Sequence, residues 1–240
     1  MRGGSTKIRA VKLLAFEAST RRLSVALWCD GALAEKSADV PNGGSERLLP
    51  WANELLTEAG LSLQQLDGIA FGAGPGGFTG LRLACGVTQG LAYGLDIPVV
   101  PVGTLAALVF ASGDGKVLAC LDARMNEVYV AAYRVAGESV EELMAPKVGA
   151  GATAPLPEGT GWRGVGDGFG VWGEILRQRL GSRLSLADAA LYPTAAAVAR
   201  LAAPRLARGA GVTAAEAIPL YIRDKVALTT AERKARGGLR

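Results

Sequence analysis

Residues 13–27 read LLAFEASTRRLSVAL, and residues 118–132 read LACLDARMNEVYVAA. At an offset of 105 residues, four aligned positions are identical and Glu17 faces Asp122. Each copy is an apolar strand that ends in a carboxylate and an alanine, followed by a polar turn and a second apolar strand. The repeat predicts two similarly built domains that face each other, and chance similarity between short β-rich segments is the alternative.

Helix and strand patterns alternate around the two copies. Residues 45–59 and 81–95 have the apolar spacing of helices, and residues 97–102, IPVVPV, have the pattern of a short strand. The Asp30-Gly31 dipeptide predicts a hairpin into a third strand. This alternation predicts an α/β fold in which each domain is a mixed sheet with flanking helices.

The repeat also suggests where the domains divide. We expect an N-terminal domain over residues 1–102 and a C-terminal domain over residues 103–240. Residues 149–170 are rich in glycine and proline and predict an irregular loop. Residues 194–208 have the pattern of an alanine-rich helix with Thr194 as its N-cap, and we expect this helix to pack back on the first domain.

Composition removes several classes of function. The chain has no histidine and three widely separated cysteines, so histidine-based nucleophiles and histidine-containing metal sites are excluded. We predict no metal site, no disulfide framework and buried cysteines. No apolar run approaches the roughly 18–20 residues that span a bilayer, and no signal-peptide pattern opens the chain. We therefore expect a cytoplasmic protein that does not contact the membrane.

The net charge of +4 comes from the two ends of the chain. Residues 1–12 and 223–240 are basic, while the body between them is mildly acidic. Solvated tails are one interpretation of this distribution, and weak contact with a polyanion is the other.

Residues 72–80, GAGPGGFTG, form a glycine-rich loop ahead of a helical pattern. No G-K-[ST] follows, so the loop is not a Walker A sequence. We interpret its glycines first as the geometry of a tight strand-to-helix turn, and second as an anion site at a helix start. The candidate anion or nucleotide contacts are Glu17, Ser19, Thr20, Gly76, Gly77 and Thr79.

Three glycines then recur at four-residue spacing inside the second helical pattern. Each glycine within a helix costs about 0.5–1 kcal/mol relative to alanine, so the stripe needs a compensating reason. A stripe of small residues lets another helix lie close, either in the protein's own core or at an interface. We predict an interface made with the apolar face of residues 45–59. Its candidate residues are Leu48, Trp51, Ala52, Leu55, Leu56, Arg82, Gly86, Gly90 and Gly94.

Five motifs together resemble the TsaB (YeaZ) family over residues 12–227. They are FEAST, SERLLP, GPGGFTGLRLACGVTQGLA, LDARMNEVY and PLYIRDKVA, in chain order. The chain departs from common family patterns at two places. Glu17 stands where many members have aspartate, and NGGSER stands where many have a histidine before Ser-Glu.

The resemblance implies two actin/Hsp70-like (ASKHA) domains. It also implies a subunit of the bacterial complex that adds a threonylcarbamoyl group to the adenosine next to the anticodon, in tRNAs that read codons beginning with adenine. The implied partners are a catalytic TsaD-like paralogue and a TsaE-like ATPase, with a homodimer when the chain is alone and tRNA contacted indirectly. The resemblance implies no catalytic residue and no cofactor in the isolated chain, with ATP or ADP at a composite site of the complex.

Two other classes of function remain as alternatives. An ASKHA-type ATPase or kinase would have a glycine after the carboxylate of its first phosphate turn, whereas Glu17 is followed by alanine. A glycopeptidase of the type once assigned to this superfamily would need metal ligands, and histidine is absent. A nucleic-acid-binding module would interleave aromatic and basic residues, but aromatic residues make up only 6% of the chain.

Overall fold

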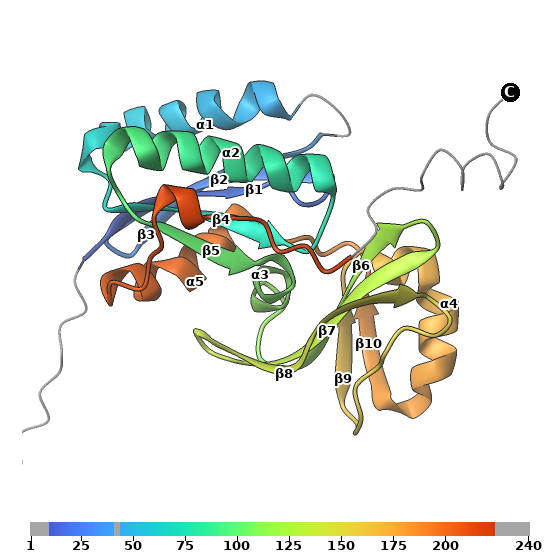
Figure 1. Cartoon of the computed structure of the whole chain (residues 1–240). Helices are drawn as coiled ribbons and strands as arrows, with labels where there is room; N and C mark the ends of the chain where they lie inside the picture. Colours follow the sequence, from blue (N-terminus) through green and yellow to red (C-terminus); the bar gives the residue numbers. More distant parts are fainter. Residues whose placement is uncertain (1–9, 41–43, 224–240) are drawn as a thin grey trace, which may run out of the picture.

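The structure, a computed structural model, describes residues 10–40 and 44–223 and contains two five-stranded sheets (Figure 1). The first sheet has the strand order β3-β2-β1-β4-β5 and the second the order β10-β9-β6-β7-β8. The first is built from β1 (Lys12–Glu17), β2 (Arg22–Cys29), β3 (Ala32–Asp39), β4 (Gly68–Gly74) and β5 (Val99–Gly103). The second is built from β6 (Gly115–Arg124), β7 (Glu127–Ala136), β8 (Ser139–Ala150), β9 (Trp162–Val165) and β10 (Leu184–Asp188).

The two sheets have the same topology. In each, the first three strands of the domain form an antiparallel meander, and the fourth and fifth pair in parallel next to the first. The repeated stretches of the sequence are β1–β2 in one domain and β6–β7 in the other. The predicted α/β fold, with two mixed sheets and flanking helices, is therefore confirmed, and the repeat reflects shared architecture.

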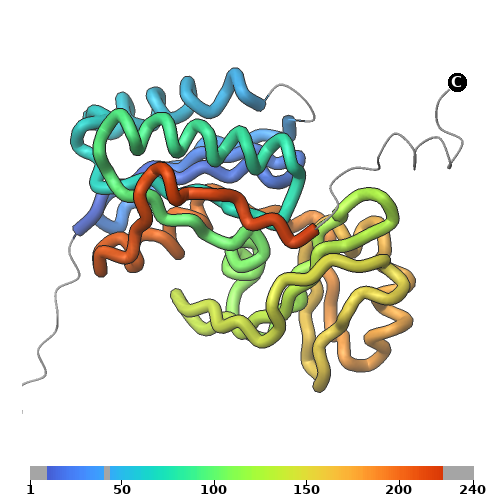
Figure 2. Tube along the Cα trace, in the orientation of Figure 1, coloured from blue at the N-terminus to red at the C-terminus, as the bar shows by residue number. Residues whose placement is uncertain are grey.

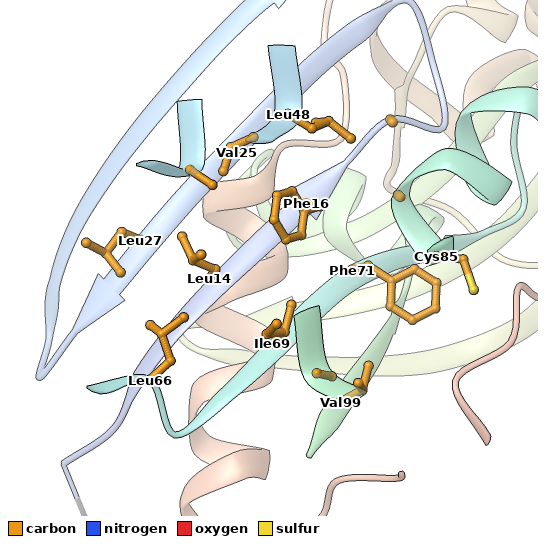
Figure 3. Packing of buried hydrophobic residues seen from close by; sticks show 14 of the residues in the cluster. Leu14, Phe16, Val25, Leu27, Leu48, Leu66, Ile69, Phe71, Cys85 and Val99 are labelled. Carbon is orange, nitrogen blue, oxygen red and sulfur yellow. The ribbon is translucent and has the colours of Figure 1, made fainter. Parts of the chain in front are cut away.

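Helices cover both faces of the first sheet. The helices α1 (Ser45–Glu58) and α2 (Phe78–Leu95) lie on one face, and α5 (Ala195–Ala207) lies on the other (Figure 1). A strand covered on both sides can be apolar throughout, and every residue of β4 is buried. Figure 3 shows the core under α1 and α2, where Phe16 and Phe71 pack with Leu48 and Cys85.

The C-terminal part of the chain returns to the first domain. The helix α5 begins at the predicted N-cap, where Thr194 Oγ1 accepts a hydrogen bond from Ala197 N (3.2 Å). Ala195 N donates to Ser24 Oγ on β2 (2.7 Å). Beyond α5, Val99 N donates to Val212 O (2.9 Å), so the chain after the second domain runs beside β5. The short helix η3 (Ala214–Glu216) follows.

One of the remaining helices lies in the first domain ahead of β4, and the others join the domains or lie in the second domain. They are α3 (Thr104–Phe110), α4 (Gly168–Leu180), η1 (Leu63–Gln65) and η2 (Gly181–Arg183). None of the described helices is both long and apolar enough to cross a membrane. Two of the three cysteines, Cys85 and Cys120, are buried as predicted, and Cys29 is half-buried.

Two local predictions are wrong. Residues 149–170 are not irregular throughout, because β9 and the first turn of α4 lie within them. The four residues of β9 are too few to show a strand period, and their burial comes from pairing with β6. The helix α2 begins at Phe78, three residues before the predicted start, because Gly77 is its N-cap and the last residues of the glycine-rich stretch form its first turn.

Candidate functional site

The exposed side of α2 carries the glycine stripe. Gly86, Gly90 and Gly94 are all exposed, and a Cβ added at any of them would meet no heavy atom within 4 Å outside the neighbouring turns of α2. The described part of the chain therefore does not fill this stripe with its own core. We name the stripe, together with the exposed Tyr93 beside it, the glycine face. The helix α2 itself runs between α1 on one side and the part of the chain that follows α5 on the other (Figure 1).

Most of the predicted contacts from α1 do not lie on this surface. The side chains of Leu48, Ala52, Leu55 and Leu56 are buried in the first core against the sheet. An amphipathic helix turns its apolar stripe to its own sheet, so these four residues are core and their assignment to an interface is corrected. On α1, Trp51 is half-buried beneath Arg47, whose guanidinium carbon lies 5.7 Å from the ring centroid.

Arg82, another predicted interface residue, makes contacts with two aromatic residues of the same chain. Its guanidinium lies 3.8 Å from the centroid of the Phe78 ring, and its Nε donates to Tyr221 Oη (3.0 Å). The Phe78 and Tyr221 rings are 5.8 Å apart. All three side chains are at least partly exposed, so the cluster is a surface feature at the N-terminal end of α2.

The glycine-rich loop that precedes α2 approaches the turn between β1 and β2. A Cβ at Gly80 would lie 1.7 Å from the Ala18 carbonyl oxygen, and a Cβ at Gly76 would lie 2.5 Å from Ser19 Cβ. Gly77 N donates to Ser19 O (2.6 Å). The loop therefore meets another part of the same protein, and the interpretation as a tight strand-to-helix turn is confirmed. At Gly76 and Gly80 these contacts leave no room for a Cβ atom.

Glu17 lies under this turn and is fully buried. Its Oε1 accepts a hydrogen bond from Ser19 N (2.7 Å), and a Cβ at Gly72 would lie 1.9 Å from its Oε2. Burial raises the pKa of Glu17, and the hydrogen bonds from Ser19 oppose that shift only in part. Because Glu17 is covered by the turn and is not among the residues that line the cleft described next, its assignment as an anion contact is corrected.

A cleft with a volume of about 810 Å³ lies between the two domains. The first domain lines it with residues 18–21 and 75–81, and the second domain with residues 121–125 and Asp167. Residues 220–223 line it as well. Among the predicted anion contacts, Ser19, Thr20, Gly76, Gly77 and Thr79 all lie on its wall.

The cleft wall carries both signs of charge. On the second domain, Asp122 N donates to Asp167 Oδ1 (2.9 Å), and Arg124 lies 3.3 Å from the Asp122 carboxylate. Burial raises the pKa of Asp167, which favours its protonated form. Arg21 and Arg223 also line the cleft. No lysine lines it, and the described residues contain no group of three potential metal ligands. The wall could accept a polar molecule, but we find no nucleophile paired with a base on it.

Sequence reasoning missed the part of the site that comes from the end of the chain. The motif PLYIRDKVA was noted for its resemblance, but no role was predicted for Leu220, Tyr221 or Arg223. Their positions depend on the path of the chain beyond α5, beside β5 and the end of β4, which no local pattern indicates. Residues 1–9 and 224–240 of the predicted basic ends lie outside the described residues.

Comparison with known proteins finds relatives over nearly the whole chain. The tRNA threonylcarbamoyladenosine biosynthesis protein TsaB of Escherichia coli is 34% identical over 229 residues, which cover 90% of this chain and 96% of the relative. The protein of the same name from Haemophilus influenzae is 34% identical over 234 residues, which cover 89% of this chain and 94% of the relative. A family model described as TsaD, tRNA N6-adenosine threonylcarbamoyltransferase, matches residues 42–160.

Solved structures match the fold over a similar length. The structure described as YeaZ from Pseudomonas aeruginosa has a TM-score of 0.81 and 38% sequence identity, and the match covers 88% of this chain and 99% of that chain. A second structure from the same organism, of an uncharacterized protein with similarity to peptidase YeaZ, has a TM-score of 0.82 and 38% identity. That match covers 89% of this chain and 100% of the other.

Proposed function

Since this chain belongs to the TsaB family, we propose that it acts in the biosynthesis of threonylcarbamoyladenosine in tRNA, as a scaffold subunit without catalytic activity of its own. The proposed partner is the catalytic TsaD-like paralogue. The match of residues 42–160 to the TsaD family model supports this choice, because it relates the chain to the enzyme that would be its partner. Two related chains can pair through equivalent surfaces, as the two copies in a symmetric dimer do.

The observation that carries the proposal is the open glycine face. Gly86, Gly90 and Gly94 have no neighbour in the space that a side chain would occupy, although each lowers the stability of α2. The distance between two packed helices depends on the side chains at the contact, so a face of glycines admits the close approach of a second helix. A partner helix on this face would account for the stripe. The same surface would serve a second copy of the chain when the partner is absent.

The composition of the cleft supports the lack of independent activity. Its acidic side chains accept hydrogen bonds within the second domain, Asp167 from Asp122 N and Asp122 from Arg124 N, and no histidine or lysine lies on its wall. We propose that ATP or ADP binds only at a site shared with the partner, that a TsaE-like ATPase joins the complex, and that tRNA is reached through the complex. We propose a cytoplasmic location together with these assignments.

Gly90→Leu tests the proposal. A leucine at this exposed position has room in the isolated chain, so we expect a thermal melt close to that of the wild type. The same side chain would keep a partner helix away, so we expect the variant to lose binding to the catalytic subunit in a pull-down and in native mass spectrometry. Modification of tRNA by the reconstituted complex should be lost with it.

Gly170→Leu is the matched control. Gly170 is exposed on α4 of the second domain, where an added Cβ would make an ordinary contact of 3.7 Å with Ala189 Cβ. We expect this variant to bind the catalytic subunit as the wild type does. Normal binding by folded Gly90→Leu would contradict the proposal, and a strongly lowered melting temperature for Gly90→Leu would assign the stripe to the protein's own core.

A further inference from the structure

The C-terminal segment, residues 218–223, passes from the first domain to the second along the cleft (Figure 2). On the first domain, Leu220 N donates to Ala73 O at the end of β4 (2.6 Å). A Cβ at the next residue, Gly74, would lie 2.9 Å from Leu220 O, and Gly74 has a φ of +111°. The end of β4 is therefore shaped to receive this segment closely.

Further contacts hold the segment to α2. Ala217 O, just before it, accepts hydrogen bonds from Cys85 Sγ (3.1 Å) and Gln89 Nε2 (2.9 Å). Tyr221 then joins the exposed cluster with Phe78 and Arg82. These contacts fix the segment along one side of α2 up to the mouth of the cleft.

Two residues later the chain is anchored to the second domain. Arg223 Nη2 donates to Ala123 O (2.9 Å) and to the carboxylate of Glu127. Its guanidinium lies 6.0 Å from the centroid of the Tyr129 ring, and its side chain is only 14% exposed. A charge-assisted hydrogen bond at a site with little solvent is stronger than one on an open surface.

Arg223 forms hydrogen bonds to both sides of the turn between β6 and β7. Ala123 and Glu127 flank this turn, and the three residues between them, 124–126, all have positive φ values. Left-handed backbone is unfavourable for residues other than glycine, so the turn is held by its surroundings. Arg223 binds both of its ends.

The two domains also share a fixed contact away from this segment. On α3, Ala107 belongs to a core cluster of the first domain, whereas Leu105, Leu108 and Val109 belong to a core cluster of the second. Domains that share a limited contact are expected to move relative to each other unless a further contact holds them.

We propose that residues 218–223 are a clasp that sets the separation of the two domains, and that the cleft opens about α3 when Arg223 releases the β6–β7 turn. The anchor on β4 is made by the backbone and the anchor on the turn by one side chain. Release at Arg223 therefore removes the hold of the segment on the second domain, while the segment stays attached to the first and α3 still joins the two. The clasp controls access to the cleft residues of both domains.

Distance measurement between spin labels tests the clasp in the isolated full-length chain. Asn53→Cys on α1 and Glu174→Cys on α4 place one label at an exposed position in each domain. Cys29→Ser removes the half-buried native cysteine, and Cys85 and Cys120 are buried. With the clasp intact we expect a narrow distance distribution. With Arg223→Ala we expect a broader distribution that extends to longer distances.

Two further variants separate the clasp from other effects. Arg134→Ala removes an exposed ion pair with Glu141 in the same domain, and we expect it to leave the distribution unchanged. Glu127→Gln keeps a hydrogen-bond acceptor and removes the charge, so we expect a partial broadening. If circular dichroism shows that Arg223→Ala does not fold, the distance distribution of Glu127→Gln tests the clasp instead. Superimposable distributions for the wild type and the folded clasp variant would overturn the inference.

The clasp does not depend on the proposed partner. Gly90→Leu changes the glycine face and none of the clasp contacts, so we expect it to keep the wild-type distance distribution. Loss of partner binding in Gly90→Leu and opening of the domains in Arg223→Ala are thus separate outcomes, and either can fail without the other.

Discussion

Two sets of glycines lie within 25 residues of each other, and their surroundings are opposite. Gly76 and Gly80 each face an atom of the β1–β2 turn, and Gly72 faces the Glu17 carboxylate at the end of β1, at distances that no real Cβ could occupy. Gly86, Gly90 and Gly94 face open space. The first set is required by the fold of this chain. The second set is not, and each of its members weakens the helix that carries it.

The comparison shows that glycine has two different roles in this chain, which the sequence alone does not distinguish. In the loop, glycine allows two backbones of one protein to touch. On α2, no contact within the described residues needs glycine, and the partner helix proposed above would supply such a contact. Substitution by alanine should therefore have opposite signs in the two sets.

Gly80→Ala should have the largest effect. The added Cβ would lie 1.7 Å from the Ala18 carbonyl oxygen, and backbone atoms on both sides leave no flexible group to yield. Overpacking of this kind costs typically 1–3 kcal/mol, and a backbone clash at the upper end, so we expect a loss of about 3 kcal/mol or more. Urea unfolding measures it.

Gly77→Ala provides a graded control for that substitution. Its Cβ would lie 3.2 Å from the Ser19 carbonyl oxygen, so a small shift would accommodate it. We expect a clearly smaller loss of stability than for Gly80→Ala. Equal losses for the two variants would mean that close contact with the turn is not what requires glycine in the loop.

Glu17→Gln tests the buried carboxylate that lies against Gly72. We expect a smaller change in the free energy of unfolding than for Gly80→Ala. Burial raises the pKa of Glu17, so the folded protein binds its proton more tightly than the unfolded chain does. The ionised carboxylate therefore costs stability at neutral pH, and this cost disappears as the pH falls to the ordinary pKa of glutamate.

Glutamine keeps an oxygen that can accept the hydrogen bond from Ser19 N and cannot ionise. We expect Glu17→Gln to be more stable than the wild type at neutral pH, with the difference shrinking as the solution is acidified. Urea unfolding at several pH values measures the difference. A difference that stays constant with pH would show that ionisation of Glu17 does not contribute.

Gly90→Ala should have the smallest effect, with the opposite sign to Gly80→Ala. Alanine is favoured over glycine within a helix by about 0.5–1 kcal/mol, and nothing obstructs the added methyl group. We expect the isolated chain to gain stability by about that amount. Gly86→Ala should behave alike, because its surroundings are equally open. A loss of stability in Gly90→Ala or Gly86→Ala would show that the glycines on α2, like those of the loop, are required by the fold of the chain.

Much of the architecture could be predicted from patterns that are local. The hairpin at Asp30-Gly31 has positive φ at both residues, as its turn type requires, because few residue pairs adopt that conformation. The α5 cap at Thr194 was also found, since capping depends only on adjacent residues. The start of α1 has no such local signal in the structure. The N-cap of α1 is Gly44, and no side chain caps it by a hydrogen bond.

The candidate site could be predicted only in part. The glycine stripe is visible in the spacing of residues, but whether it faces the core or the solvent depends on the tertiary fold. The apolar residues of α1 were assigned to an interface because periodicity identifies a face and does not identify what covers it. Arg223 meets Glu127 across 96 residues of sequence, and a pattern read along the chain contains no information about such a contact.

Gly86, Gly90 and Gly94 have no side-chain torsions, so these three residues have none to immobilise when another surface covers them. At an ordinary interface, ordering a long side chain costs about 0.5–1.5 kcal/mol in conformational entropy. The backbone freedom of these glycines is already lost when α2 folds, at about 0.5–1 kcal/mol each relative to alanine. The three glycines therefore lose their conformational entropy when the chain folds. Little more would be lost when a partner helix packs against them.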